Sequence, residues 1–168
     1  MAVDPIADAV RVADRDRYLS ALYAPAGHRA DLMALYAFNA EVAGIRDRIR
    51  EALPGEIRMQ WWRDVIASGD VVAGGHPLAA ALMRTIVANE LPRSAFDAYL
   101  EARIFDLYDD PMPSRTDLEG YGGETASAII QLSALVLDRA AATKVADLAG
   151  PIQFSTPEPG IQSRMNSR

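Results

Sequence analysis

One stretch of the chain, residues 32–49, constrains the fold more than any other. Apolar residues recur there at spacings of three and four and form one stripe of a helix, namely Leu35, Phe38, Val42, Ile45 and Ile49. The nearly opposite side carries Tyr36, Ala40, Ala43 and Asp47, because each residue turns an α-helix by about 100°. A helix that is apolar or small on two sides is usually enclosed by neighbouring helices. The sequence therefore predicts an all-α fold, a helical bundle with this stretch at its centre.

The rest of the chain divides into helical segments at clusters of proline and glycine, and the cluster at 53–55 is expected to end the central helix. We predict further helices over residues 5–12, 14–23, 56–68, 77–89, 94–108, 116–137 and 138–148. In the segment 56–68, Trp61 is expected in the core and Trp62 at its margin, because Ile57, Val65 and Ile66 lie on the side of Trp61. Residues 1–149 are predicted to form a single domain. Residues 150–168 lack a periodic apolar face and are predicted to form an irregular or disordered tail.

Length and charge narrow the class of protein. The chain has 168 residues, a formal net charge of −6 and no cysteine. Its acidic balance argues against nucleic acid as a partner, and the absence of cysteine excludes disulfides and thiolate metal sites. The amino terminus lacks a signal-peptide pattern, and no apolar run approaches the roughly 18 residues that a membrane span needs. We therefore expect a cytoplasmic protein with no membrane span, and peripheral association with a membrane is the alternative.

A tetrapeptide in the central stretch carries a resemblance to a known family. Leu-Tyr-Ala-Phe at 35–38, with Pro25 and Arg29 upstream, resembles the squalene/phytoene synthase family. The sequence of residues 37–47, followed by Arg-Met-Gln-Trp-Trp at 58–62, resembles the complex I assembly-factor branch of that family. The resemblance runs from about residue 18 to residue 148. It implies a bundle of the isoprenoid-synthase type, incomplete at its C-terminus because the helices and the second aspartate motif that follow in the family are missing from this sequence.

The family's first aspartate motif is degenerate in this chain. Synthases of the family join two prenyl diphosphates and use aspartates to hold Mg²⁺, a hard cation that neutralises the departing diphosphate. The resemblance places those aspartates on Ala43, Gly44 and Asp47, so a single carboxylate remains. Asp47 and Glu41 are the candidate metal ligands, although they lie about 120° apart around the helix. No cofactor is expected unless the protein is catalytic, in which case it would need Mg²⁺.

Three further residues are candidates for substrate binding, and several acidic residues have a structural interpretation. The resemblance implies that Tyr121, Arg29 and Tyr36 bind substrate; Tyr121 matches the first tyrosine of the family's Y-C-Y-x-V-A-G pattern. Four aspartates have a structural interpretation, as helix caps or as acidic, water-facing helix ends: Asp14, Asp16, Asp106 and Asp110. The same holds for Asp109, and His76, which precedes a proline, is expected to be a cap or a solvated residue.

Three functions remain open from the sequence. The first is a non-catalytic family member with a degenerate metal site, which binds an isoprenoid lipid, a prenyl diphosphate or a protein partner. An apolar face left uncovered by the missing helices would serve such a partner, or a second copy in a homodimer. The second is an active Mg²⁺-dependent prenyl transferase of squalene or phytoene biosynthesis. The third is a truncated product without independent activity.

Overall fold

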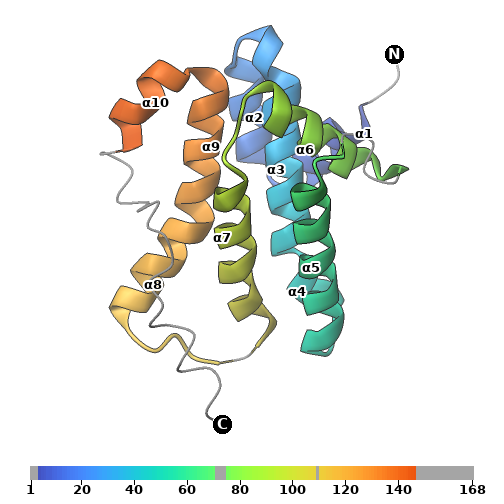
Figure 1. The fold of residues 1–168 in the computed structure, drawn as a ribbon, viewed down its shortest axis with the longest axis vertical. Coiled ribbons are helices and arrows are strands. Elements are labelled where there is room, and N and C mark those ends of the chain that lie inside the picture. The colour runs from blue at the N-terminus through green and yellow to red at the C-terminus, as the bar shows by residue number, and fades with distance from the viewer. Residues whose placement is uncertain (1–3, 71–74, 109, 147–168) are drawn as a thin grey trace.

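The computed structural model describes residues 4–70, 75–108 and 110–146, and every regular element in these ranges is helical (Figure 1). The prediction of an all-α bundle is therefore confirmed. The elements are α1 (Pro5–Ala13), α2 (Arg15–Tyr23), η1 (Ala26–His28), α3 (Arg29–Ala43), α4 (Ile45–Arg48), α5 (Ala52–Ser68), α6 (Pro77–Ala88), α7 (Arg93–Ile104), η3 (Phe105–Leu107), α8 (Arg115–Gly122), η4 (Gly123–Ser127), α9 (Ala128–Leu137) and α10 (Arg139–Ala146). The tail expected at 150–168 lies outside the described residues.

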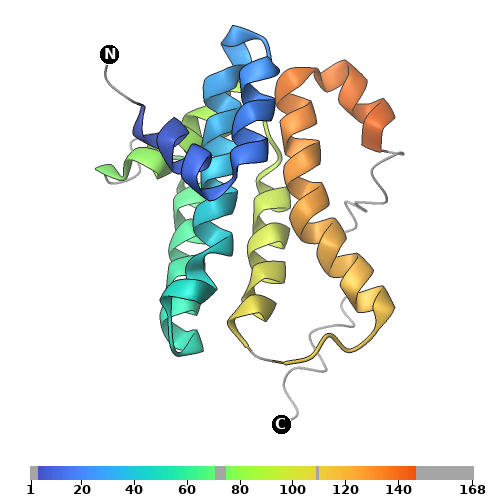
Figure 2. The same ribbon diagram turned by 180° about the vertical axis from the view of Figure 1, so that it is seen from behind.

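Helix α3 is the centre of the bundle, as its two apolar sides predict. It contacts α1, α2, α6, α7 and α9, and eight of its fifteen residues are buried. Figures 1 and 2 show α8, η4 and α9 following one another along one edge of the molecule and α5 along the other, with α3 and α7 between them. Because α3 is covered from several directions, residues on most of its surface contact other helices.

The central helix is interrupted at Gly44, where the sequence predicted one continuous helix. A Cβ atom at Gly44 would lie 2.9 Å from the Arg48 guanidinium and 3.1 Å from the carbonyl oxygen of Ala40. The residues beyond this point form the separate short helix α4, which ends at Arg48. Asp47 therefore lies on a different element from Glu41, and a single helix face cannot present both carboxylates.

Helix α5 begins before the proline that was expected to precede it. Its first residue is Ala52, so Pro54 and Gly55 lie in the first turn. A proline is tolerated there because the first N–H groups of a helix have no intrahelical acceptor to lose. Gly55 is buried, and its backbone packs against Leu107 and Ile49.

The two adjacent tryptophans of α5 have exchanged their expected positions. Trp62 is fully buried, whereas Trp61 is half-buried and Ile57 is 62% exposed. The buried residues of α5 are Gly55, Met59, Trp62 and Ile66, which share a face at helical spacing. The prediction that Trp61 is the core residue was therefore wrong, because the alternative stripe one residue further on is the one turned toward α3 and α7.

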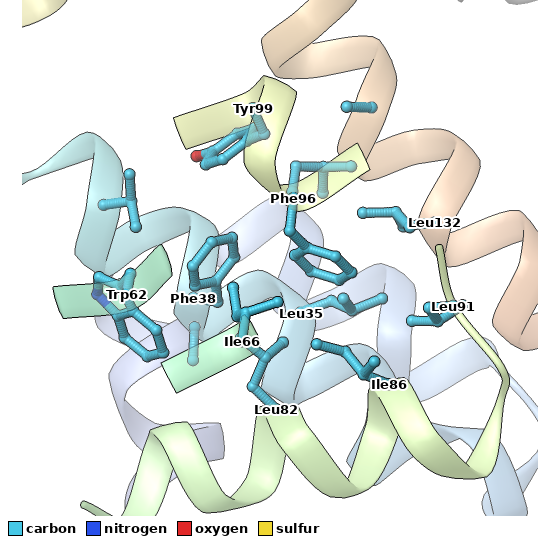
Figure 3. Close-up of a cluster of buried hydrophobic side chains, with 14 of the residues drawn as sticks. Leu35, Phe38, Trp62, Ile66, Leu82, Ile86, Leu91, Phe96, Tyr99 and Leu132 are labelled. Atoms are coloured by element: carbon cyan, nitrogen blue, oxygen red, sulfur yellow. The ribbon is translucent and has the colours of Figure 1, made fainter. Parts of the chain in front are cut away.

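An aromatic cluster around Phe38 of α3 forms the middle of the core (Figure 3). The Phe38 ring lies 5.0 Å from that of Trp62, 5.7 Å from that of Phe96 and 5.4 Å from that of Tyr99. Edge-to-face contacts of this kind add to the stabilisation from apolar burial. Phe38 thus links α3 to α5 and α7 in a single layer.

The segment predicted as one helix over 116–137 is helical throughout but contains a π-turn. α8 begins one residue before Thr116, with Ser114 as its N-cap, since Ser114 Oγ accepts a hydrogen bond of 3.1 Å from the Asp117 N–H. The π-helical turn η4 joins α8 to α9, and α10 packs on α9. Among the helices of the described part, none is long and apolar enough to cross a membrane.

Candidate functional site

A cluster of polar side chains joins α7, η3 and α8 around Tyr121, one of the residues predicted to bind substrate. The Tyr121 hydroxyl donates a hydrogen bond of 2.6 Å to Asp106 Oδ1. Arg103 Nη1 donates to Asp106 Oδ2 at 2.9 Å and to the Tyr121 hydroxyl at 3.0 Å. Arg103 and Asp106 are mostly buried, with side chains 15% and 24% exposed. The expectation that Asp106 faces water is therefore wrong.

The cluster continues into the core through Tyr99. Arg103 Nε donates to the Tyr99 hydroxyl at 3.3 Å, and this hydroxyl donates to Asn39 Oδ1 of α3 at 2.9 Å. Tyr99 is fully buried and Asn39 nearly so. A chain of five side chains thus runs from α3 through α7 and η3 to α8. We call Asn39, Tyr99, Arg103, Asp106 and Tyr121 the polar network.

The two tyrosines and the arginine of the polar network have raised pKa values and therefore keep their protons. Burial raises the pKa of Tyr99, and the nearby charge of Arg103 offsets this only in part. Burial and the hydrogen bond to Asp106 raise the pKa of Tyr121 to about 12. Burial alone would lower the pKa of Arg103, but Tyr99 and Asp106 outweigh it and raise the pKa above its usual value. At neutral pH both hydroxyls are protonated and Arg103 is charged. The two hydroxyl protons are donated to Asn39 and Asp106, so the guanidinium of Arg103 supplies the donors that remain for a ligand.

The other two predicted substrate residues have different surroundings. Tyr36 lies on α3, one turn before Asn39, and its ring centroid is 5.9 Å from the guanidinium carbon of Arg17. The positive charge of Arg17 also lowers the pKa of Tyr99. Arg29 is exposed at the start of α3, where its Nε donates to the Ala24 carbonyl at 2.9 Å and braces the preceding loop. Tyr36 is therefore near the polar network, and Arg29 is about two helical turns away from Tyr36 along α3.

The two candidate metal ligands do not form a metal site. The Glu41 carboxylate is paired with Arg58 of α5, and Asp47 is exposed on α4. Throughout the described ranges, no group of three or more His, Asp or Glu side chains is placed to hold a metal ion. Mg²⁺ bound to diphosphate needs carboxylates free to coordinate it. These residues do not fit Mg²⁺, because one carboxylate is neutralised by a guanidinium and the other lies apart from it.

Two of the residues interpreted structurally are helix caps, as expected. Asp14 Oδ1 accepts from the Arg17 N–H at 2.9 Å at the start of α2. His76 Nδ1 accepts from the Ala79 N–H at 3.2 Å at the start of α6. Asp16 and Asp110 are exposed, and Asp109 lies outside the described residues.

Sequence reasoning missed two members of the polar network, Asn39 and Tyr99. A signal was present for each: Asn39 is a lone amide within an apolar helix, and Tyr99 precedes Arg103 by one helical turn. Asn39 lies in α3, which is buried on most sides, and Tyr99 lies on the buried face of α7, so each polar group must find a partner inside the protein. Their mutual hydrogen bond joins residues sixty positions apart, and helix periodicity gives no information on such a pairing.

Two surface cavities lie beside α5, and no residue of the polar network lines either of them. One of about 310 Å³ is lined by Leu53, Ile57 and Ile104 among others, and one of about 210 Å³ by residues that include Arg63 and Arg93. None of the three predicted substrate residues lines either cavity.

The fold and the site define an all-α helical bundle whose central helix carries Leu-Tyr-Ala-Phe and whose neighbouring elements hold the Tyr121–Asp106 pair. The family model described as squalene/phytoene synthase matches residues 10–152. The chain belongs to the squalene/phytoene synthase family.

The similar curated proteins are mammalian and share one name, "NADH dehydrogenase (ubiquinone) complex I, assembly factor 6". The protein of Bos taurus is 29% identical over 131 residues, that of Homo sapiens 28% over 131 residues and that of Rattus norvegicus 30% over 129 residues. Each match covers 76% of this chain and 39% of the relative, so the chain spans about two fifths of their length. No solved structure matches the chain significantly.

Proposed function

We propose that the protein is a non-catalytic member of the squalene/phytoene synthase family with an assembly-factor role in the biogenesis of complex I. The observation that carries the proposal is the Glu41–Arg58 pair on α3 and α5, beside Ala43 and Gly44 at positions where synthases carry aspartates. The name shared by its mammalian relatives supports the same role. In this protein a guanidinium neutralises the carboxylate that Mg²⁺ would otherwise need.

The ligand class we propose is an isoprenoid lipid or a prenyl diphosphate, with Tyr121, Tyr36 and Arg29 as binding residues. The polar network supports this, because Arg103 is charged and has guanidinium N–H groups beyond those that bond Tyr99, Asp106 and Tyr121, so it can donate to a polar head group. An isoprenoid partitions into lipid, so we expect a cytoplasmic protein that spends part of its time at the membrane surface. Fractionation of cells into soluble and membrane pools measures this distribution.

A protein partner or a second copy would use an apolar surface. Leu118 of α8 and Ile130 and Leu137 of α9 are 54%, 53% and 43% exposed, so three large apolar side chains reach solvent on these consecutive helices. Exposed apolar residues grouped in this way favour protein contacts. Light scattering of the purified protein distinguishes a homodimer from a monomer that awaits a different partner.

The alternative, an active prenyl transferase, is favoured by the intact pair of Tyr121 and Asp106. Incubation with farnesyl or geranylgeranyl diphosphate and Mg²⁺, followed by measurement of released pyrophosphate, separates the two functions. We expect no release above that of a blank without protein. Release that is abolished by Asp47→Ala would overturn the non-catalytic proposal.

Loss of the gene in its native cell tests the assembly role. We expect less assembled complex I on native gels and a lower NADH–ubiquinone activity. Re-expression of the wild-type protein and of the Asp47→Ala variant should restore both to the same extent, because no metal is required. An unchanged amount of complex I in the deletion strain would contradict the assembly role, whatever the outcome of the pyrophosphate assay.

A further inference from the structure

Helices α5 and α7 pack against each other, and the two surface cavities lie along this pair of helices (Figure 1). Both cavities are lined by residues of α5 and of α7, and Arg63 of α5 belongs to the lining of both. We call the two cavities together the α5–α7 groove. Its lining on α5 runs from Leu53 to Ala67, which is about 21 Å at 1.5 Å per helical residue.

The α5–α7 groove lies on the side of α7 that is turned away from the polar network. Asp97 lines the groove, and Glu101 pairs with Arg63. Each of these acids precedes a network residue, Tyr99 or Arg103, by two positions, and two positions turn a helix by about 200°. The groove is therefore a different surface from the one proposed to bind a lipid.

Much of the α5–α7 groove is apolar. Leu53 and Ile57, one turn apart on α5, are 63% and 62% exposed, and both line the larger cavity together with Ile104 of α7. Ile66 and Leu100 belong to the core and line the smaller cavity. Large aliphatic side chains that stand in water beside a cavity are stabilised when an apolar surface covers them. The groove therefore favours a partner with an apolar stripe.

The charged side chains of the groove are mostly acidic. Four carboxylates and two guanidinium groups line it or bond to its lining residues, so the local charge is −2. The carboxylates are those of Glu56, Asp64, Asp97 and Glu101, and the guanidinium groups are those of Arg63 and Arg93. Glu124 lies on η4, which packs on α7, and burial together with the negative charge of Glu101 raises the pKa of Glu124.

Two of these carboxylates are held by neutral groups alone. Glu56 accepts from the Tyr108 hydroxyl, and Asp64 Oδ1 accepts from the Gln60 amide at 2.8 Å. Within the described ranges neither carboxylate has a cationic partner. The other two, Asp97 and Glu101, share the single guanidinium of Arg63, and their side chains are 69% and 61% exposed. The rim of the groove is therefore able to pair with positive charges brought by a partner.

We propose that the α5–α7 groove binds an amphipathic helix of a partner protein, with lysine or arginine residues beside its apolar stripe. The apolar stripe covers Leu53 and Ile57, and the basic residues pair with Glu56 and Asp64. A helix suits the groove better than an extended strand, because the backbone groups of α5 and α7 are bonded within their own helices and offer no sheet edge. The inference deepens the proposed assembly role, on which it rests for the existence of a protein partner.

Fluorescence anisotropy of labelled synthetic peptides, titrated with the whole chain, tests the groove. The probe is an alanine-rich peptide of about 14 residues, the length that matches about 21 Å of helix, with leucines at spacings of three and four and flanking lysines. A second peptide has the same composition with the leucines moved off a single face, and a third has glutamate in place of lysine. We expect the first peptide to bind at least about tenfold more tightly than either of the others.

Two double variants separate the apolar contribution from the charge. Leu53→Gln with Ile57→Gln should weaken binding of the first peptide at least about tenfold, because both aliphatic contacts are removed. The matched control is Leu118→Gln with Ile130→Gln, since these residues of α8 and α9 are 54% and 53% exposed, and it should bind like the wild type.

Glu56→Gln with Asp64→Asn keeps an acceptor for Tyr108 and for Gln60 while it removes two negative charges. We expect at least about threefold weaker binding and a smaller dependence on salt concentration. The control for charge is Asp16→Asn, because Asp16 is exposed on α2, and it should bind like the wild type.

Three results overturn the proposal. The first is equal binding of the rearranged peptide, since attraction to the net charge of −6 would then be sufficient. The second is weakening by the Leu118 and Ile130 pair and not by the Leu53 and Ile57 pair. The third is a dimer in light scattering that Leu53→Gln with Ile57→Gln converts to a monomer, which assigns the groove to a second copy.

The groove and the assembly role fail in different experiments. Absence of peptide binding, with complex I still reduced in the deletion strain, removes the groove and keeps the assembly role. Specific binding of the first peptide, with complex I unchanged in that strain, keeps the groove and removes the assembly role.

Discussion

At the residue scale, Tyr99 decides whether the polar network holds together. Its hydroxyl donates to Asn39 and accepts from Arg103, so it connects the buried amide of α3 to the partly exposed ion pair of Arg103 and Asp106. A buried amide without a hydrogen-bond partner destabilises the fold by the full desolvation free energy of that amide. Asn39 is therefore tolerated within an apolar helix because one tyrosine of α7 reaches it.

Replacement of Tyr99 by phenylalanine keeps the ring and removes this connection. We expect the free energy of unfolding to fall by about 1–3 kcal/mol, because Asn39 Oδ1 is left buried and unpaired. Urea unfolding followed by circular dichroism measures the change. The control is Tyr23→Phe, since Tyr23 is 91% exposed, and it should leave stability unaltered. Equal stability of the Tyr99 and Tyr23 variants would show that the network contributes nothing.

The raised pKa of Tyr121 predicts a loss of stability in alkali. Burial and Asp106 hold this pKa at about 12, against an ordinary value of 10.0 in the unfolded chain. The folded state binds the proton more tightly, so this stabilisation is complete below about pH 10 and is lost as the pH rises to about 12. Tyr121→Phe should lose less stability than the wild type between those two pH values, measured by urea unfolding at each. Identical losses in the two proteins would contradict the assignment.

At the element scale, the join between α5 and η3 depends on the absence of a side chain at Gly55. A Cβ atom at this position would lie 2.6 Å from Leu107 Cδ2 and 2.7 Å from Ile49 Cδ1. The chain leaving α4 and the turn after α7 both pack against this first turn of α5. The glycine that was expected to end a helix instead lets three segments meet.

Two glycine-to-alanine substitutions should move stability in opposite directions. Gly55→Ala overpacks the join at a cost of about 1–3 kcal/mol, which is at least as large as the roughly 1 kcal/mol that alanine gains in helix propensity. Gly120→Ala lies in α8, where a new Cβ meets nothing within 4 Å, and should raise the free energy of unfolding by up to about 1 kcal/mol. Chemical denaturation of both variants compares them. Stabilisation by Gly55→Ala would mean that Leu107 and Ile49 move aside freely.

At the scale of the whole molecule, one aromatic layer joins the helices that the chain order keeps apart. Phe38, Trp62, Phe96 and Tyr99 come from α3, α5 and α7, and their rings are in mutual contact through Phe38 (Figure 3). The stability of a domain of this size is about 5–15 kcal/mol, so a single large cavity in the layer removes a substantial part of it.

The two tryptophans provide a direct test of this layer. Trp62→Ala should lower the free energy of unfolding by about 3–5 kcal/mol, because the whole side chain is buried. Trp61→Ala should cost less than half as much, since Trp61 is only half-buried and mainly supports Arg58. Guanidinium unfolding of both variants measures the difference. A larger loss from Trp61→Ala would restore the assignment made from the sequence.

Most of the helices could be predicted from the sequence, since helix periodicity, prolines and glycines are local signals, but the break at Gly44 and the start of α5 before Pro54 could not. The central position of the helix within residues 32–49, the caps at Asp14 and His76 and the degenerate aspartate motif all followed from residue types at short spacing. The rotation of α5 could not be read in the same way. Two adjacent tryptophans fit two overlapping apolar stripes equally well, and the choice between them depends on which neighbour each stripe meets.

The sequence by itself determined that this chain is an all-α bundle of the squalene/phytoene synthase family and that its first metal motif retains one aspartate. Only the tertiary structure decided that Arg58 neutralises Glu41, that Asp106 turns inward to Tyr121, and that Asn39 meets Tyr99. The physical reason is the separation along the chain over which each signal acts. Helix propensity and hydrophobic periodicity depend on residues only a few positions apart. The partner of a buried charge or amide is chosen by packing between helices that are far apart in sequence.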